Sequence, residues 1–136
     1  MNRTVLALVD DLFWRAKIDH AVKSAQARVV FLSDPDELTA TASSSVVGVI
    51  LVDLSLRKDP IGAIDTLKKG AKTKGIPVIG YCEHMRKDLK QRGLDAGCDE
   101  VLPRSAFSEH LGDLVLKYAL PGSVRTAEEE PELPEE

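Results

Sequence analysis

The feature that most constrains the fold is an almost unbroken run of apolar residues, VVGVILVD, at residues 46–53. The run is rich in Val and Ile and is bounded by three serines before it and by Pro60 after it. This pattern favours a strand buried on both faces, as in the middle of a parallel sheet covered by helices. Because the run ends on a single acid, we expect the Asp53 carboxylate at the end of a central strand.

Four further segments resemble strands, and helical spacing of apolar residues separates them. The strand-like segments are residues 3–9, 28–33, 76–81 and 99–103. The apolar residues at helical spacing fall near 14–25, 35–42, 61–67, 85–89 (Met85 and Leu89) and 107–118. Alternation of this kind predicts parallel strands joined by right-handed crossovers, and therefore an α/β sandwich of three layers. Five such units favour the flavodoxin-like (βα)5 fold with sheet order 2-1-3-4-5.

The positions of prolines and glycines agree with these helix boundaries. An acid precedes Pro35 and another precedes Pro60, which is typical of a helix start. Gly70 and Gly97 close two of the helical segments, where glycine is common. We therefore expect helices to begin shortly after the two prolines and to end at the two glycines.

Length and charge limit the possible functions. The chain has 136 residues, enough for one domain, which we place at residues 1–120, and a net charge of -4. Six of its 22 acids lie in the last nine residues, so residues 1–127 are nearly neutral. We expect residues 121–136 to form an acidic, disordered tail. Without a basic helix, the sequence gives no case for binding nucleic acid.

The N-terminus and the cysteines indicate a cytoplasmic protein. The first apolar run is interrupted by Asp10 and Asp11, so it predicts neither a signal peptide nor a membrane span. Cys82 and Cys98 have no metal-ligand spacing, and they are expected at opposite edges of the sheet. We expect two free thiols, with Cys98 buried and Cys82 close to the site described next.

Three acids are expected to converge at one edge of the sheet. In an open parallel sheet, ligands bind beyond the carboxyl ends of the strands where the strand order reverses, here between the first and third strands. Those strands end in Asp10, Asp11 and Asp53. Mutually repelling carboxylates suit a hard cation such as Mg²⁺, and an aspartate beside Mg²⁺ can accept a phosphoryl group. The alternative is that these acids merely end strands and cap helices.

The order of these motifs resembles the receiver domain of bacterial two-component response regulators. VLALVDD is similar to its first strand with the acidic pair, and VILVD to its third strand with the phosphoacceptor. IPVIGYCEH is similar to the fourth strand, and DAGCDEVLPRSAF to the stretch through the fifth strand to a basic residue. The resemblance implies that Asp53 is the phosphoacceptor. It also implies that Asp10, Asp11, Asp53 and the Ser55 carbonyl hold Mg²⁺.

Other landmarks of that family are replaced. The hydroxyl residue falls on Cys82, a weaker donor, and the small residue after it falls on Glu83. The family's lysine falls on Arg104, which keeps the positive charge and could pair with Asp53 or with a phosphoryl group. The resemblance therefore implies that Cys82, Glu83 and Arg104 lie close to the phosphoryl group. The aromatic switch residue falls on Val101, and Arg57 stands where a proline is common. The acidic pocket is thus intact, whereas the parts that convert phosphorylation into a surface change are altered.

Two functions remain open. The first is a stand-alone response regulator of a phosphorelay, phosphorylated at Asp53 by a histidine kinase or a small phosphodonor in the presence of Mg²⁺. Its signal would pass to a downstream protein or to a homodimer. The second is a phosphorylation-independent pseudo-receiver that acts as an interaction module. Neither function is that of an enzyme. Two further residues could act at the site: His84 could donate a hydrogen bond to a phosphoryl oxygen or sense pH, and Phe13 could gate the pocket or mark a partner surface.

Overall fold

The computed structural model describes residues 3–119, which alternate between strands and helices as the sequence predicts. The strands are β1 (Thr4–Leu8), β2 (Arg28–Leu32), β3 (Val47–Asp53), β4 (Val78–Cys82) and β5 (Glu100–Pro103). The helices are α1 (Leu12–Ser24), α2 (Leu38–Ser43), α3 (Ile61–Lys69), α4 (Lys87–Ala96) and α5 (Arg104–Ala119), with a 3-10 turn, η1 (Pro35–Glu37), before α2. The predicted acidic tail lies outside the described residues.

All five strands form one parallel sheet in the order β2-β1-β3-β4-β5. The flavodoxin-like order expected from the sequence is therefore confirmed. The carboxyl ends of β1, β3 and β4 meet at one edge, because the strands run in the same direction. In that edge Asp53 of β3 pairs in register with Tyr81 of β4.

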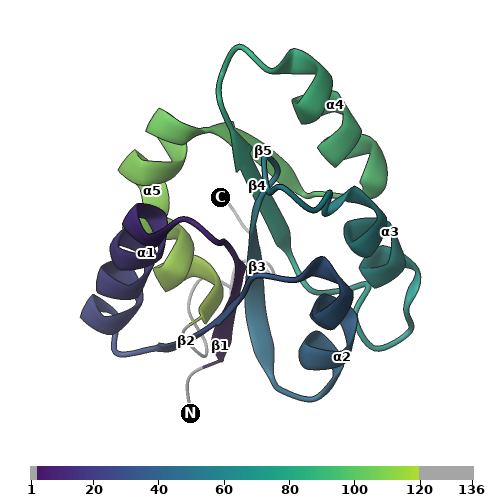
Figure 1. Cartoon of the computed structure of the whole chain (residues 1–136). Helices are drawn as coiled ribbons and strands as arrows, with labels where there is room; N and C mark the ends of the chain where they lie inside the picture. Colours follow the sequence, from purple (N-terminus) through teal and green to yellow (C-terminus); the bar gives the residue numbers. More distant parts are fainter. Residues whose placement is uncertain (1–2, 120–136) are drawn as a thin grey trace, which may run out of the picture.

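Two helical layers cover the sheet (Figure 1). Helices α1 and α5 lie on one face, and α2, α3 and α4 lie on the other. Side chains of β3 alternate between the faces: Val49 and Leu51 pack with α1 and α5, whereas Ile50 and Val52 pack with the other three helices. This double coverage explains why the strand is apolar without interruption up to its last residue.

The helix ends that the sequence predicts well are those with a capping residue. Asp11 caps α1, its side chain accepting a hydrogen bond from the Trp14 amide. Gly97 ends α4 in the left-handed region, with a φ of 118°. The expectation that Met85 lies on a buried helix face is wrong, because α4 begins only at Lys87 and the Met85 side chain is 75% exposed.

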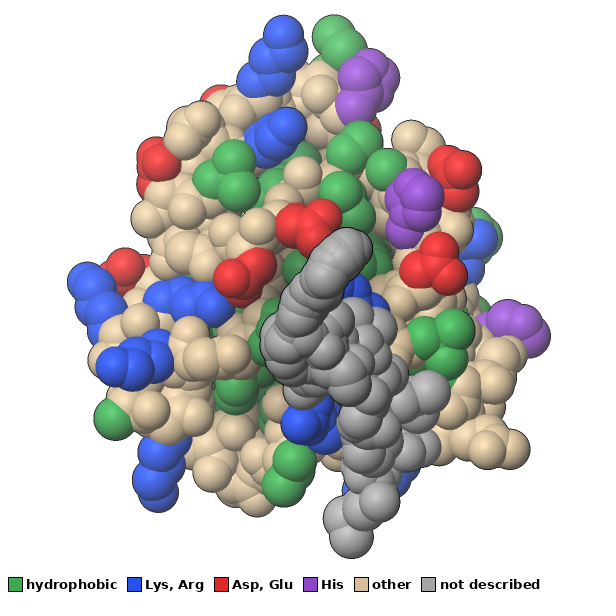
Figure 2. Space-filling view, turned by 180° about the vertical axis from the view of Figure 1, so that it is seen from behind, with side chains coloured by type: hydrophobic (Ala, Val, Ile, Leu, Met, Phe, Trp, Pro, Cys, Tyr) green, Lys and Arg blue, Asp and Glu red, His purple; other side chains and the backbone are tan. Residues whose placement is uncertain are grey.

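Two surface properties complete the description. Within residues 3–119, no helix is long and apolar enough to cross a membrane. In the view from behind, Lys and Arg side chains are interspersed with acidic, hydrophobic and uncharged groups, without a continuous basic area on the visible part of that face (Figure 2).

Candidate functional site

Asp53 is the buried acid of the structure's carboxyl edge. It continues the face of Leu51, toward α1 and α5, and its side chain accepts a hydrogen bond of 2.9 Å from the Ser55 amide. Burial raises the pKa of Asp53, and the charges of Asp11 and Asp10 act in the same direction. The Ser55 amide and the Arg104 guanidinium oppose this rise. The fold thus holds a carboxylate where its charge is disfavoured.

Asp10 and Asp11 follow β1 and are both exposed. Asp11 uses Oδ1 to cap α1, at 3.1 Å from the Trp14 amide nitrogen. Asp10 Oδ1 accepts a hydrogen bond of 3.2 Å from the Ser33 hydroxyl, which in turn accepts one of 2.8 Å from Arg15. Both acids therefore have local structural roles in addition to their charge near Asp53. Arg15 and Ser33 were not expected from the sequence.

The oxygen atoms near Asp53 are the kind of ligand that a hard cation binds, although they are not arranged as a complete metal site. Asp10, Asp11, Asp53 and the Ser55 carbonyl offer only oxygen ligands, which Mg²⁺ prefers. Among residues 3–119, however, no group of three or more His, Cys, Asp or Glu side chains is arranged to hold a metal ion. The electrostatic effect of Asp10 and Asp11 on Asp53 is the observation that favours a cation here.

Arg104, the first residue of α5, stands between two acids. Its charge lowers the pKa of Asp53, whereas its ion pair is with Glu83, at 3.9 Å between Nη1 and Oε2. The long distance and the exposure of Glu83 make this a weak pair. Glu83 therefore lies close to the cation that the resemblance assigns to the phosphoryl group.

Cys82 ends β4 and packs on the opposite side of the sheet from Asp53, among the residues that contact α3 and α4. Burial raises its pKa, so the thiol keeps its proton. A cavity of about 200 Å³ lies beside it, lined by residues that include Glu83, His84 and Arg86. Cys98 is also buried and free, as predicted. Burial raises the pKa of Cys98 to about 12.

A column of aromatic rings runs from the surface to the buried side of the site. Phe13 is 64% exposed and meets Trp14 edge-to-face at 5.7 Å between ring centroids. Trp14 contacts Tyr81 at 5.2 Å and Phe107 at 5.9 Å, and Tyr81 stacks on Phe107 at 4.3 Å. Trp14 thus packs against the core, as expected for the first apolar residue of the stripe at 14–25. Whether Phe13 gates the site or contacts a partner stays a prediction.

Sequence reasoning missed Tyr81. Among residues 3–119, two buried side-chain polar atoms have no hydrogen-bond partner, the Tyr81 hydroxyl and the Arg104 Nε. The charges of the site reach Tyr81: burial first, then the charge of Asp53, raises the pKa of Tyr81, while Arg104 lowers it. The available signal was the position of Tyr81 directly before Cys82, which strand alternation turns toward the face of Asp53.

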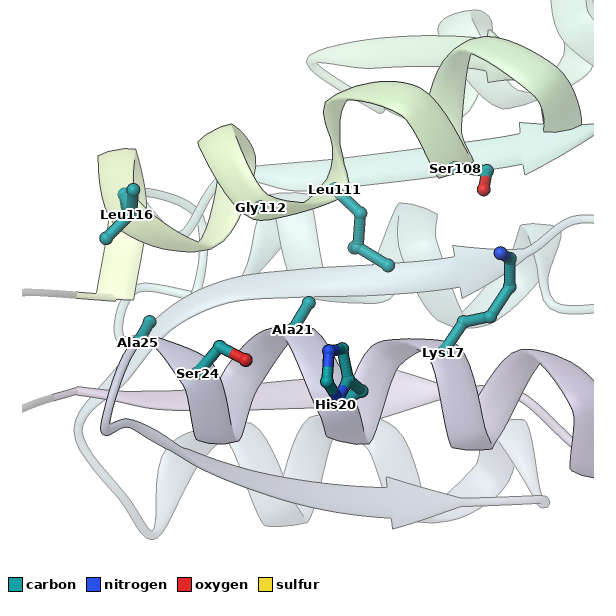
Figure 3. A pocket seen from close by; sticks show the side chains of 9 residues that line it. All are labelled: Lys17, His20, Ala21, Ser24, Ala25, Ser108, Leu111, Gly112 and Leu116. Atoms are coloured by element: carbon teal, nitrogen blue, oxygen red, sulfur yellow. The ribbon is translucent and has the colours of Figure 1, made fainter.

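A separate groove lies between α1 and α5, away from the carboxyl edge (Figure 3). It measures about 400 Å³, and small or apolar residues form its floor, including Ala21, Leu111 and Gly112. The Lys17 and His20 side chains lie on the α1 side. None of the residues predicted for the phosphorylation site lines this groove.

Comparison with known proteins identifies the fold. No family model matches the sequence, and no curated protein matches it. Among solved structures, the phosphorylated cyanobacterial phytochrome response regulator RcpA is similar, with 18% identity, a TM-score of 0.76, and coverage of 90% of this chain and 100% of that one.

Two further structures show the same likeness. The receiver domain of a sensor histidine kinase from Pseudomonas aeruginosa, with a magnesium ion coordinated in its active-site cleft, has 18% identity, a TM-score of 0.75, and coverage of 87% and 98%. The chemotaxis response regulator CheY4 of Vibrio cholerae has 21% identity, a TM-score of 0.73, and coverage of 85% and 97%. The chain therefore has the fold of response-regulator receiver domains.

Proposed function

We propose that this protein is a signalling receiver that accepts a phosphoryl group on Asp53, with Mg²⁺ held by Asp10, Asp11, Asp53 and the Ser55 carbonyl. The observation that carries the proposal is a buried acid whose pKa is raised by burial and by two neighbouring acids at the carboxyl edge of a receiver fold. Solved neighbours with bound magnesium or manganese support the choice of a divalent ion.

The chemistry requires little beyond position and charge. A carboxylate oxygen of Asp53 would attack the phosphorus of a histidine kinase phosphohistidine or of a small phosphodonor, and the leaving group would depart with the bonding electron pair. Bound Mg²⁺ would neutralise charge on the phosphoryl oxygens. The protein would then act as a switch rather than as an enzyme, passing its signal to a protein partner or a second copy.

One observation favours the second candidate, a pseudo-receiver that binds partners without phosphorylation. Arg104, the cation expected at the phosphoryl group, is paired with Glu83. While that pair persists, Glu83 stays beside the position of the phosphoryl group, and its carboxylate repels the negative charge of that group.

Phosphorylation by acetyl phosphate tests the proposal. Wild type, Asp53→Asn and Asp59→Asn are incubated with acetyl phosphate, with and without Mg²⁺, and analysed by intact mass and Phos-tag electrophoresis. Asp59 lies in the loop after β3 and serves as the matched control, because it is exposed and its removal leaves Asp53 in place. We expect an acid-labile adduct of one phosphoryl group in wild type and Asp59→Asn, dependent on Mg²⁺. No adduct in wild type would favour the pseudo-receiver.

A further inference from the structure

The Tyr81 hydroxyl is the most unusual buried group near the site. The Tyr81 side chain is fully buried, and its hydroxyl has no hydrogen-bond partner among the protein groups of residues 3–119. Buried hydroxyls almost always have a partner in folded proteins, since losing the hydrogen bonds to water is costly. An unpartnered hydroxyl beside a candidate site is therefore explained well by a ligand that brings the missing acceptor.

The position of Tyr81 in the sheet places it beside Asp53. The two residues are Cα partners at the ends of β4 and β3, and both side chains continue the face that packs against α1 and α5. Burial is the main cause of the raised pKa of Tyr81, and the charges of Asp53 and Asp11 add to it, while Arg104 opposes it. The hydroxyl is thus a donor within the electrostatic field of the predicted site.

The Tyr81 ring is held in place by aromatic packing. It stacks on Phe107 with an interplanar angle of 12° and contacts Trp14 on another side. A ring fixed in this way loses little further entropy when its hydroxyl binds a ligand. The packing therefore preorganises the Tyr81 hydroxyl as a hydrogen-bond donor.

Cys82 is poorly placed for the same role. Its side chain lies on the other face of the sheet, among Leu54, Leu89 and other residues that contact α4. A thiol is also a weak hydrogen-bond donor. The charges of Asp53 and Arg104 reach Cys82 as well as Tyr81. Of these two neighbours, Tyr81 has the stronger donor, a hydroxyl on the face of Asp53.

We propose that the Tyr81 hydroxyl donates a hydrogen bond to an oxygen of the phosphoryl group carried by Asp53, in place of a hydroxyl at Cys82. This inference rests on the proposed phosphorylation of Asp53. Arg104 Nε, which within residues 3–119 is also buried without a partner, is a second donor for the same group. A phosphoryl group supplies three acceptor oxygens and makes strong hydrogen bonds because it is charged.

Tyr81→Phe tests the inference because it removes only the oxygen. Beryllofluoride with Mg²⁺ serves as the probe for the phosphoryl group, and its affinity is measured through the fluorescence of Trp14, whose ring lies 5.2 Å from that of Tyr81. We expect Tyr81→Phe to bind the probe about 10- to 100-fold more weakly than wild type, the loss that one hydrogen bond to a charged group gives. Cys82→Ala is the matched control, with affinity within about twofold of wild type.

The stability of the free protein separates a ligand contact from a structural one. Without the probe, Tyr81→Phe should melt at the same temperature as wild type or higher, since the lost hydroxyl has no partner in the fold. A lower melting temperature together with weaker binding would show that the hydroxyl bonds within the protein, which overturns the inference.

The remaining outcomes distinguish this inference from the proposed function. Equal affinity of Tyr81→Phe and wild type, or weaker binding by Cys82→Ala alone, would overturn the role of Tyr81 and leave phosphorylation of Asp53 intact. Failure of wild type both to bind beryllofluoride and to accept a phosphoryl group would reject the proposed function and this inference together.

Discussion

At the scale of single residues, Asp53 is an acid that the fold holds where its negative charge is unfavourable. Its pKa is raised first by burial, so its charged form is destabilised by the fold. Below the ordinary value near 3.8, the carboxyl is protonated in both the folded and the unfolded chain. As the pH rises through the higher pKa of the folded state, ionisation of Asp53 removes stability from the native protein. The fold therefore disfavours a negative charge at this position.

Asp53→Asn should accordingly stabilise the protein in the absence of Mg²⁺. We expect a melting temperature at pH 7 that is higher by about 2–6 °C, the shift that roughly 1 kcal/mol gives in a domain of this size. The difference should shrink as the pH is lowered toward the ordinary pKa. Thermal melts of both proteins from pH 4 to pH 8 measure it.

Asp59→Asn is a control of opposite sign. The pKa of Asp59 is lowered, chiefly by a hydrogen bond from the Ile61 amide and then by Arg92. Its charge therefore stabilises the fold above the ordinary pKa, and this contribution is lost as the pH falls through the lower pKa of the folded state. A gain in melting temperature for Asp59→Asn equal to that of Asp53→Asn would contradict the assigned cause.

Gly97 gives a second prediction at this scale. Its φ of 118° is unfavourable for other residues, and a Cβ there would clash with the stem of Lys68. We expect Gly97→Ala to lower the free energy of unfolding by about 1–3 kcal/mol. Gly62→Ala is the matched control: this glycine lies inside α3 with open space around it, so alanine should stabilise by about 0.5–1 kcal/mol. Urea denaturation measures both, and a loss at both positions would refute the conformational argument.

The residues also show what the sequence predicts and what it does not. Gly97 was recognisable as a helix end because few residues adopt its conformation. Met85 was misassigned because its spacing to Leu89 suits a helix, while the chain forms a turn before α4. Tyr81 was missed because one aromatic residue in an apolar strand resembles core. Only its unsatisfied hydroxyl distinguishes it, and hydrogen bonding is not visible in a sequence.

At the scale of elements, Lys68 connects α3 with the starts of β4 and β5. Its ammonium donates hydrogen bonds of 2.9 Å to the Ile76 carbonyl and to Asp99 Oδ2. The same Asp99 oxygen accepts a hydrogen bond of 2.8 Å from the Val78 amide. The Lys68 side chain is only 17% exposed, so these bonds are partly shielded from water. This junction aligns the strands whose far ends form the site.

Lys68→Met should therefore lower the free energy of unfolding more than the same substitution at Lys69. Methionine keeps the length of the side chain and removes its charge, so the Ile76 carbonyl and Asp99 lose the ammonium, and Asp99 Oδ2 keeps the Val78 amide. We expect a loss of about 1–3 kcal/mol in the free energy of unfolding. Lys69→Met should cost less than about 0.5 kcal/mol, because Lys69 makes only an exposed pair with Asp65. Similar losses in urea denaturation would show that the junction carries no special weight.

The elements themselves were largely predictable. The strands are recognisable because burial on both faces requires continuous apolar runs, and β3 was expected to end at Asp53. The least regular region, residues 35–43, is a 3-10 turn followed by a helix of 6 residues. A helix that short has too few turns for a clear apolar stripe, so its pattern is weak. Strand order followed from the number of units and from the handedness of crossovers, rather than from any single residue.

At the scale of the whole molecule, the same fold suits both candidate functions, the phosphorylated receiver and the pseudo-receiver. The charges at the carboxyl edge distinguish the two. A cation among Asp10, Asp11 and Asp53 would relieve their mutual repulsion, whereas a pseudo-receiver would need Arg104 alone to do so. Arg104 is also drawn toward Glu83. Sequence reasoning could place the acids at one edge, because topology dictates it. It could not show that Arg104 stands between Glu83 and Asp53, since that depends on side-chain conformation.

Stabilisation by Mg²⁺ should distinguish the two candidate functions in the unphosphorylated protein. A ligand that binds only the folded chain, at ten times its dissociation constant, adds about 1.4 kcal/mol to the free energy of unfolding. We expect Mg²⁺ to raise the melting temperature of wild type by several degrees and that of Asp11→Asn much less. Asparagine caps a helix as well as aspartate does, so this variant removes the charge and keeps the start of α1. Asp65→Asn, an acid of α3, should respond as wild type does. An equal rise in Asp11→Asn would place the ion elsewhere, and no rise in wild type would favour the pseudo-receiver, with Arg104 as the resting counter-charge.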